Sequence, residues 1–189
     1  MCNHTYTVSP FIEGVQWTKR CPYPEFYEAA RRVPWALPED PRSLELPLDA
    51  SGACIFHSRD LDWKRENDLP QRFLELLQLL ERAQTKMYDF TEFVFVGTEL
   101  RALPTGEENI LRLHDLTIRE QADFLGATFV DTLELKDVKI KVQATFRRAT
   151  FLRDLIILNS SVHSLSFSEA ALQGRFRLED VDCLGDAAV

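Results

Sequence analysis

The chain has 189 residues and a formal net charge of −8 at pH 7. That length suits one domain with an appendage or two small domains, and the charge argues against general affinity for nucleic acid or anionic membrane. No apolar run approaches the ~20 residues that cross a bilayer, and MCNHTYTVSP at the start lacks the basic and apolar regions of a signal peptide. We therefore expect a cytoplasmic protein whose cysteines are thiols or metal ligands rather than disulfides.

The first 67 residues are rich in proline and lack a regular hydrophobic period. Residues 22–47 hold six of the nine prolines of the chain. Proline fixes φ and removes a backbone donor, so we expect residues 1–67 to form an irregular, extended segment. Such a segment needs a surface to lie on or a clamp.

A metal-binding clamp is available within this segment. Cys54-Ile55-Phe56-His57 places a thiolate and an imidazole on one tight turn, and Cys2 and Cys21 complete a Cys3His set suited to zinc. His4 is a second candidate for the first ligand, because Cys2-Asn3-His4 is compact enough that only one of the two side chains needs to bind. The alternative is that these residues are unliganded surface and core side chains.

From Asp68 the hydrophobic period becomes helical. Asp68 is suited to cap the first turn, and Phe73, Leu76, Leu77 and Leu80 form one apolar stripe. We expect an amphipathic helix over residues 68–87 that covers the first coil of the repeat described next, because the end of a solenoid exposes apolar core and unpaired strand edges. A partner-binding helix is the alternative.

Residues 88–189 carry a short repeat. Large apolar residues recur every five or six positions, and each is preceded two residues earlier by a second inward residue, as in ADFLGATF, ATFRRATF and FRLEDVDC. A separation of two puts both side chains on one face of an extended segment, so each pair predicts a very short strand that points inward. Cys183 falls on one of these inward positions, which predicts a buried side chain in the core.

This repeat resembles the pentapeptide-repeat family, in which a small residue, a polar residue and a central Phe or Leu recur. ADFLG, ATFVD and ATFRR carry the resemblance, whereas Leu133, Val138 and Leu155 stand where alanine is usual. The resemblance implies a mainly β fold, a right-handed four-sided β-helix of about four coils. The segment SGACIFHS also resembles half of a small zinc-binding module found ahead of some bacterial pentapeptide repeats, although the insertion between Cys21 and Cys54 is long here.

Two features break the uniformity of the repeat. Residues 97–110 interrupt the register with Gly97, Pro104 and Gly106, which predicts a projecting loop. Basic residues concentrate between Lys136 and Arg153 and acidic residues between Glu169 and Asp186, which predicts adjacent basic and acidic belts on successive coils. These belts could steer a partner or form a solvated exterior.

The sequence contains no phosphate-binding glycine loop, nucleophile elbow or histidine-rich hydrolase motif. We therefore expect a non-enzymatic protein-interaction module that binds another protein. The family resemblance offers an alternative, a DNA-mimicking modulator of a topoisomerase such as gyrase, with which the net charge agrees and the basic belt disagrees. Direct nucleic-acid binding is a weaker hypothesis, and an uncovered last coil would favour a homodimer formed through the C-terminal coil.

Overall fold

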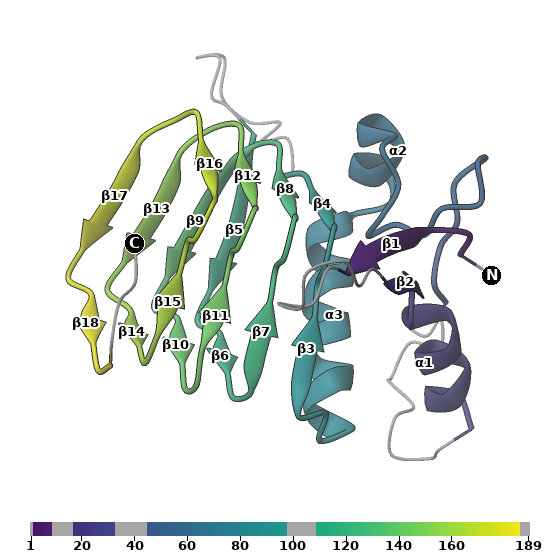
Figure 1. Ribbon diagram of the computed structural model, residues 1–189, viewed down its shortest axis with the longest axis horizontal. Coiled ribbons are helices and arrows are strands. Elements are labelled where there is room, and N and C mark those ends of the chain that lie inside the picture. The colour runs from purple at the N-terminus through teal and green to yellow at the C-terminus, as the bar shows by residue number, and fades with distance from the viewer. Residues whose placement is uncertain (1, 9–16, 33–44, 98–108, 186–189) are drawn as a thin grey trace.

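The computed structural model describes residues 2–8, 17–32, 45–97 and 109–185, and it shows a β-solenoid with a small helical cap at one end (Figure 1). None of its helices combines the length and the apolar character needed to cross a membrane, as far as the described residues go. The elements ahead of the solenoid are β1 (Thr5–Val8), β2 (Trp17–Arg20), α1 (Tyr23–Ala30), α2 (Leu61–Glu66) and α3 (Leu69–Arg82).

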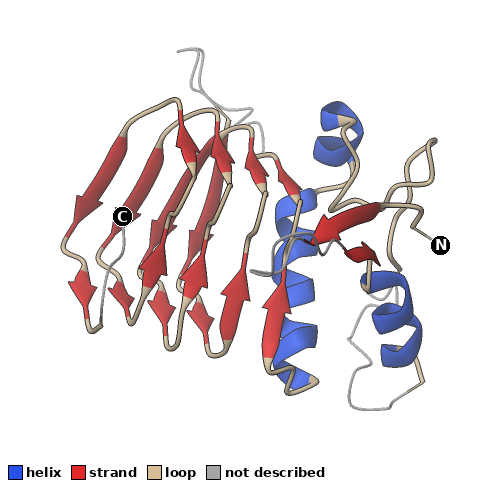
Figure 2. Cartoon of the chain, viewed as in Figure 1, coloured by secondary structure: helices blue, strands red, loops and turns tan. Residues whose placement is uncertain are grey.

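The solenoid consists of four parallel sheets, each four strands deep, so the predicted four-sided architecture is confirmed (Figure 2). In chain order each successive strand lies on the next side. The first side holds β3 (Met87–Asp89), β7 (Gln121–Asp123), β11 (Ala144–Thr145) and β15 (Leu165–Ser166); the second holds β4 (Val94–Phe95), β8 (Thr128–Phe129), β12 (Thr150–Phe151) and β16 (Ala171–Leu172). The third holds β5 (Ile110–His114), β9 (Thr132–Lys136), β13 (Leu155–Leu158) and β17 (Phe176–Glu179); the fourth holds β6 (Thr117–Ile118), β10 (Lys139–Ile140), β14 (Ser161–Val162) and β18 (Asp182–Cys183).

Phenylalanine rings stack in columns along the solenoid axis. Phe129 lies 4.8 Å from Phe95 and 4.7 Å from Phe151, centroid to centroid, with the rings nearly parallel. A second column joins Phe124 to Phe146 at 4.7 Å. Each ring is buried because the coil above and the coil below place the same side chain at the same position. The repeat therefore produces the core directly, since equal spacing in the sequence becomes vertical alignment in space.

Two corners of the solenoid use left-handed backbone in every coil, and the corner before the fourth side does so at Asp or Asn. Asp115, Asp137, Asn159 and Asp180 all have φ between 44° and 55°, and each precedes a strand of the fourth side. Asp and Asn tolerate this conformation better than other residues that carry a Cβ. The turn from the third side to the fourth is therefore encoded by the residue type at a single repeated position.

The predicted capping helix is α3, which begins at Asp68 as its N-cap and covers the first coil. The ring of Phe73 meets Phe90 at 5.0 Å and Phe95 at 4.9 Å, both edge-to-face. Leu69, Leu76 and other apolar residues on the same face of the helix are buried with it. The apolar end of the first coil is thus removed from water, as the amphipathic pattern predicted.

A fully buried lysine lies between the cap and the first coil. The Lys64 ammonium group donates hydrogen bonds to the carbonyl oxygens of Phe56, at 3.1 Å, and Val94. Burial lowers the pKa of Lys64 from 10.5 to about 7. The ammonium group donates hydrogen bonds to two carbonyl groups at the end of the strand ladder. In exchange, its charge loses its hydration by water.

Several expectations for the ends of the chain differ from the structure. The segment of residues 1–67 is not wholly irregular: Pro22 and Pro24 begin α1 instead of preventing a helix, because proline is tolerated in the first helical turn. Cys183 is exposed rather than buried, because among the described strands β18 has a neighbour on one side only. Most of the loop predicted at residues 97–110 lies outside the described residues.

Replacement of Phe129 by alanine should lower the free energy of unfolding by roughly 3–5 kcal/mol, because it leaves a cavity in the middle of a ring column. Denaturant unfolding measures this change. The control is Val142→Ala, whose side chain is 42% exposed and should cost under about 1 kcal/mol. Equal losses for the two variants would contradict the packing described here.

The stability of the protein should depend on pH through Lys64. Between pH 7 and about 10.5 the unfolded chain binds a proton at Lys64 that the folded chain does not, so the free energy of unfolding rises with pH across that window, by up to roughly 5 kcal/mol. Denaturant unfolding of the wild type and of Lys64→Met, both in the same metal state, should give curves that diverge as pH rises. Parallel curves would show that Lys64 keeps its ordinary pKa.

Candidate metal centre

Three separate segments bring four buried ligand side chains to one point beside the first coil. Cys2 precedes β1, Cys21 connects β2 to α1, and Cys54 and His57 belong to the turn that follows residues 45–53. The β1–β2 hairpin is antiparallel, with Thr5 opposite Arg20, so its two ends carry Cys2 and Cys21 to the same place. A hydrogen bond from the Cys21 amide to the His4 carbonyl, at 3.1 Å, extends this pairing toward the site.

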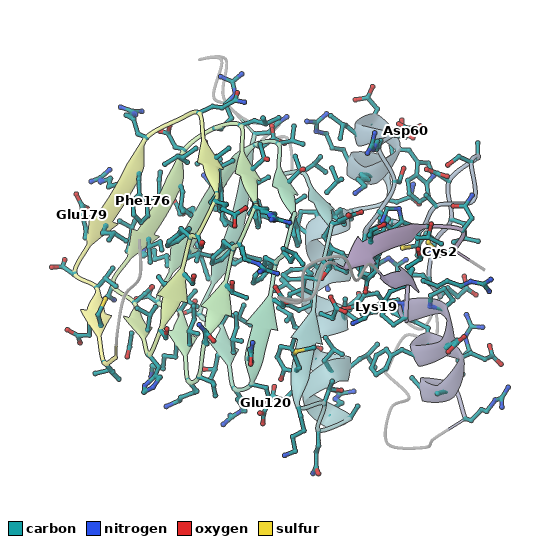
Figure 3. All side chains as sticks on the ribbon, viewed as in Figure 1. Cys2, Lys19, Asp60, Glu120, Phe176 and Glu179 are labelled. Carbon is teal, nitrogen blue, oxygen red and sulfur yellow. The ribbon has the colours of Figure 1, made fainter. Side chains whose placement is uncertain are left out.

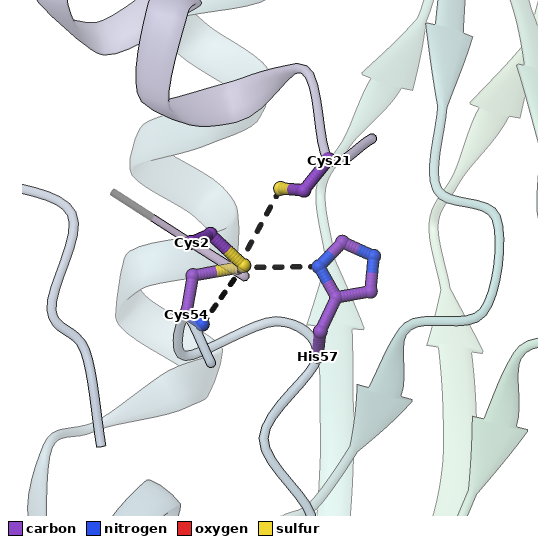
Figure 4. A group of neighbouring side chains, drawn as sticks. All are labelled: Cys2, Cys21, Cys54 and His57. Carbon is purple, nitrogen blue, oxygen red and sulfur yellow. Dashed lines mark hydrogen bonds between the residues drawn. The ribbon is translucent and has the colours of Figure 1, made fainter. Parts of the chain in front are cut away.

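The four ligand atoms lie within 4.8 Å of one another (Figure 4). Sγ of Cys21 is 3.8 Å from Sγ of Cys54, and Nδ1 of His57 is 3.2 Å from the same sulfur. A tetrahedral ion with Zn–S bonds of about 2.3 Å needs sulfur atoms roughly 3.8 Å apart. The donor set and its spacing therefore fit a four-coordinate metal ion.

The turn that holds Cys54 and His57 is built by backbone hydrogen bonds. The Cys54 carbonyl accepts from the amides of His57, at 2.9 Å, and Ser58, at 2.8 Å. The carboxylate of Asp49 accepts from the Ala53 amide and from the hydroxyl of Ser58 on either side of the turn. The cysteine and the histidine are thus fixed on one face before any ion binds.

The ring of His57 is oriented by a hydrogen bond at the nitrogen that faces away from the three cysteines. Its Nε2 lies 3.2 Å from the carbonyl oxygen of Thr91, which fixes Nε2 as the donor and leaves Nδ1 free to bind metal. His4 stacks on the His57 ring at 4.1 Å and lies 3.1 Å from the Glu92 carboxylate. His4, the second candidate for the first ligand, therefore lies beside the group of four, and Cys2 lies within it.

The three thiols form hydrogen bonds with one another, and these bonds shift their pKa values in opposite directions. Hydrogen bonds from the thiols of Cys21 and Cys54 lower the pKa of Cys2, and the same interactions raise the pKa values of Cys21 and, to about 12, Cys54. The Cys54 amide, 3.2 Å from the sulfur of Cys2, also donates to it. A bound divalent cation would supply the charge that allows all three sulfurs to be thiolates.

The turn that carries Cys54 and His57 is joined directly to the solenoid. The ring of Phe56, between the two ligands of the turn, stacks on Phe93 at 4.8 Å with an interplanar angle of 4°. The Val94 amide donates to the Phe56 carbonyl at 2.9 Å, much as strands do between coils. Tyr6 and Tyr23 both donate to Asp89 of β3, so the hairpin and α1 rest on the same coil.

Sequence reasoning identified the four clustered residues but not the groups that support them. Thr91 and Glu92 are distant from the candidate ligands in sequence, and Lys64 follows His57 closely but belongs to no metal-binding pattern. Thr91 and Glu92 occupy the corner between β3 and β4, so only the docking of the N-terminal segment on the first coil brings them to the site. The available signal was the large Phe93 at a position where later coils carry Ala127 and Ala149, since the ring of Phe93 stacks on Phe56 of the N-terminal segment.

Comparison with known proteins gives no match to this chain. No family model matches the sequence, and neither curated proteins nor solved structures contain a significant relative. The geometry of the solenoid and of the Cys/His cluster therefore has to carry any functional argument.

The double variant Cys54→Ser, His57→Asn should lose bound metal, which elemental analysis of the purified protein measures as a fall from about one ion per chain. Limited proteolysis should then cut the β1–β2 hairpin and α1 faster, because their shared attachment is gone. The matched control is Cys183→Ser, since Cys183 is exposed and lies outside the cluster. Metal content and protease resistance that match the wild type would refute the site.

Proposed function

We propose that this chain is a non-enzymatic protein-interaction module of the pentapeptide-repeat type, held together at its N-terminal end by structural zinc. Its partner is another protein, which binds the third side of the solenoid. The observation that carries the proposal is the composition of that side, where apolar and oppositely charged outward side chains are mixed.

The repeat type is supported by the structural roles of the motif residues. In ADFLG, ATFVD and ATFRR the central residues Phe124, Phe129 and Phe146 occupy the ring columns. The small residues two positions earlier are Ala122, Ala127 and Ala144, all fully buried. At these three motifs a small and a large inward residue follow one another as in the family motif, whereas Leu133 and Leu155 are large residues at the small position.

Zinc is supported by the ligand chemistry. Three thiolates and one imidazole are soft to borderline ligands in a tetrahedral set, which zinc prefers over magnesium or calcium. All four side chains are buried, so the site is closed, as structural zinc sites are. The metal would tie the hairpin and α1 to the first coil and would take no part in a reaction.

The third side of the solenoid has the longest strands and an outward face of mixed character. Ile156 and Leu158 point outward from β13, whereas their neighbours Leu155 and Ile157 are buried inside. Charged residues of both signs flank the two aliphatic side chains on the adjacent strands β9 and β17, namely Glu134, Lys136, Arg177 and Glu179. An apolar centre with a charged rim is typical of a protein-binding surface.

Among the described residues, the solenoid interior leaves little room for a substrate. Its phenylalanine columns and aliphatic side chains fill the core, and the void beneath α3 measures only about 20 Å³. That volume is about the size of one water molecule. A reaction would therefore have to occur on the outside of the solenoid.

One observation favours the second candidate function, in which the protein mimics DNA and so modulates a topoisomerase such as gyrase. The left-handed corner places Asp115, Asp137, Asp180 and Asp182 along a hollow of about 390 Å³. A row of carboxylates along the axis resembles a phosphate backbone in sign. However, Lys139 lines the same hollow, and Arg148 pairs with Glu169 of the next coil at 2.7 Å, so the exterior mixes both charges.

The partner-binding surface is tested with Ile156→Asp, Leu158→Asp. Because two aliphatic contacts become charged, affinity for the partner should fall at least about tenfold, while the thermal midpoint stays close to that of the wild type. The partner is first identified by cross-linking to the wild-type protein and then purified for calorimetry. The control, Ser161→Asp, His163→Asp, places two carboxylates on the fourth side of the same coil and should change affinity less than about threefold.

Equal losses of affinity in both double variants would indicate a general charge effect and refute the third side as the binding surface. A supercoiling assay with purified gyrase separates the second candidate. Inhibition or protection of gyrase that survives Ile156→Asp, Leu158→Asp would favour mimicry over the interaction module.

A further inference from the structure

The candidate metal centre would place a net charge in the interior of the protein. A divalent ion bound by three thiolates and one neutral imidazole carries one net negative charge. The histidine is neutral in this arrangement because its Nε2 donates to the Thr91 carbonyl while its Nδ1 faces the cysteines. All four ligand side chains are buried, so water screens this charge poorly. A buried charge is costly unless an opposite charge lies close by.

Lys64 is the only lysine or arginine that is buried among the residues that the structure describes. Its ammonium nitrogen lies 3.1 Å from the carbonyl oxygen of Phe56, which stands between Cys54 and His57 in the chain. The ammonium group therefore lies against the turn that carries two of the four candidate ligands. Burial lowers the pKa of Lys64, and the negative charges of Cys54 and then of Asp49 raise it. The charge of the lysine and the charge of the cluster thus act on each other.

The docking of α2 holds the Lys64 side chain in this position. The helix begins at its N-cap Asp60, which lies at the same end of the molecule as Cys2 (Figure 3). The neighbouring Arg65 pairs with Asp131 of the solenoid at 3.2 Å, which ties the helix to the coils. Lys64 is therefore kept in the interior by the attachment of the whole helix.

Other polar groups beside the cluster do not supply a positive charge. His4 stacks on the ring of His57, but it lies 3.1 Å from the Glu92 carboxylate, which offsets any charge that His4 carries. The Cys54 amide that donates to the sulfur of Cys2 contributes a dipole and no net charge. The ammonium group of the buried lysine is therefore the group that can balance an anionic complex.

We propose that Lys64 is the counter-charge of the metal centre, so that its ammonium group stabilises the anionic complex of a divalent cation with the four clustered side chains. The inference rests on the proposed zinc site and gives the lysine a role in metal affinity beside its hydrogen bonds to the solenoid. A complex with a net negative charge favours the charged form of a nearby lysine. Because such coupling is reciprocal, the charged lysine favours the complex by the same free energy.

Competition with a chromophoric chelator measures the zinc affinity of the purified full chain. Lys64→Met keeps most of the length of the side chain and removes its charge, so the zinc dissociation constant should rise at least about tenfold. The control Lys19→Met makes the same substitution at an exposed lysine of β2, on the hairpin that leads to Cys21, and should change the constant less than about threefold. A wild-type chain that binds no zinc overturns the proposed metal site and this inference with it, whereas equal affinities of the wild type and Lys64→Met overturn the inference alone.

A series of ligand changes separates the charge of Lys64 from its structural role. Cys2→His gives two thiolates and two imidazoles, whose zinc complex is neutral, and His57→Cys gives four thiolates, whose complex carries two negative charges. Added to these variants, Lys64→Met should raise the dissociation constant less than about threefold in the neutral set and more than in the wild type in the doubly negative set.

Visible absorption of the cobalt-loaded variants checks that each ligand set keeps a four-coordinate geometry. A purely structural role of Lys64 would give the same loss of affinity in all three ligand sets, because its packing and hydrogen bonds do not depend on the charge of the complex. Equal losses in the three sets, including losses caused by misfolding of Lys64→Met, therefore overturn the proposal.

Discussion

The structure depends on the stacking of one coil on the next. Each coil of two- to five-residue strands has little core of its own, and it becomes stable only when the neighbouring coils bury its inward side chains and pair its backbone. The ring columns show this directly, because Phe129 is buried by Phe95 below it and Phe151 above it. A stack of this kind leaves its first coil in need of cover.

At the N-terminal end, the first coil is covered by short elements, most of which would not be stable on their own. α3 shields the first coil, but the β1–β2 hairpin and the eight-residue α1 are too short to be stable alone. The Cys/His cluster joins them to the turn containing Phe56, and that turn continues the solenoid through ring stacking and a backbone hydrogen bond. Structural zinc contributes on the order of 10 kcal/mol to small modules, which is large compared with what these elements gain from burial. The metal we propose would therefore decide whether this part of the chain is folded.

Much of the fold could be predicted from the sequence because a solenoid converts sequence period into position. The inward pairs located the strands of the solenoid. The candidate metal ligands were recognisable because Cys54 and His57 share one turn. The buried state of Cys183 was predicted wrongly, since the period gives the direction of a side chain but not whether another layer covers it. The hairpin and the environment of Lys64 depend on contacts between distant segments, which short-range patterns do not encode.

The most direct test of this account is X-ray absorption at the zinc edge of the purified protein. The account predicts a four-coordinate ion with three sulfur ligands at about 2.3 Å and one nitrogen at about 2.0–2.1 Å. Such a shell would establish that Cys2, Cys21, Cys54 and His57 close the N-terminal end around a metal. A shell of only nitrogen and oxygen ligands, or protein free of metal with an equally protected N-terminal segment, would contradict it.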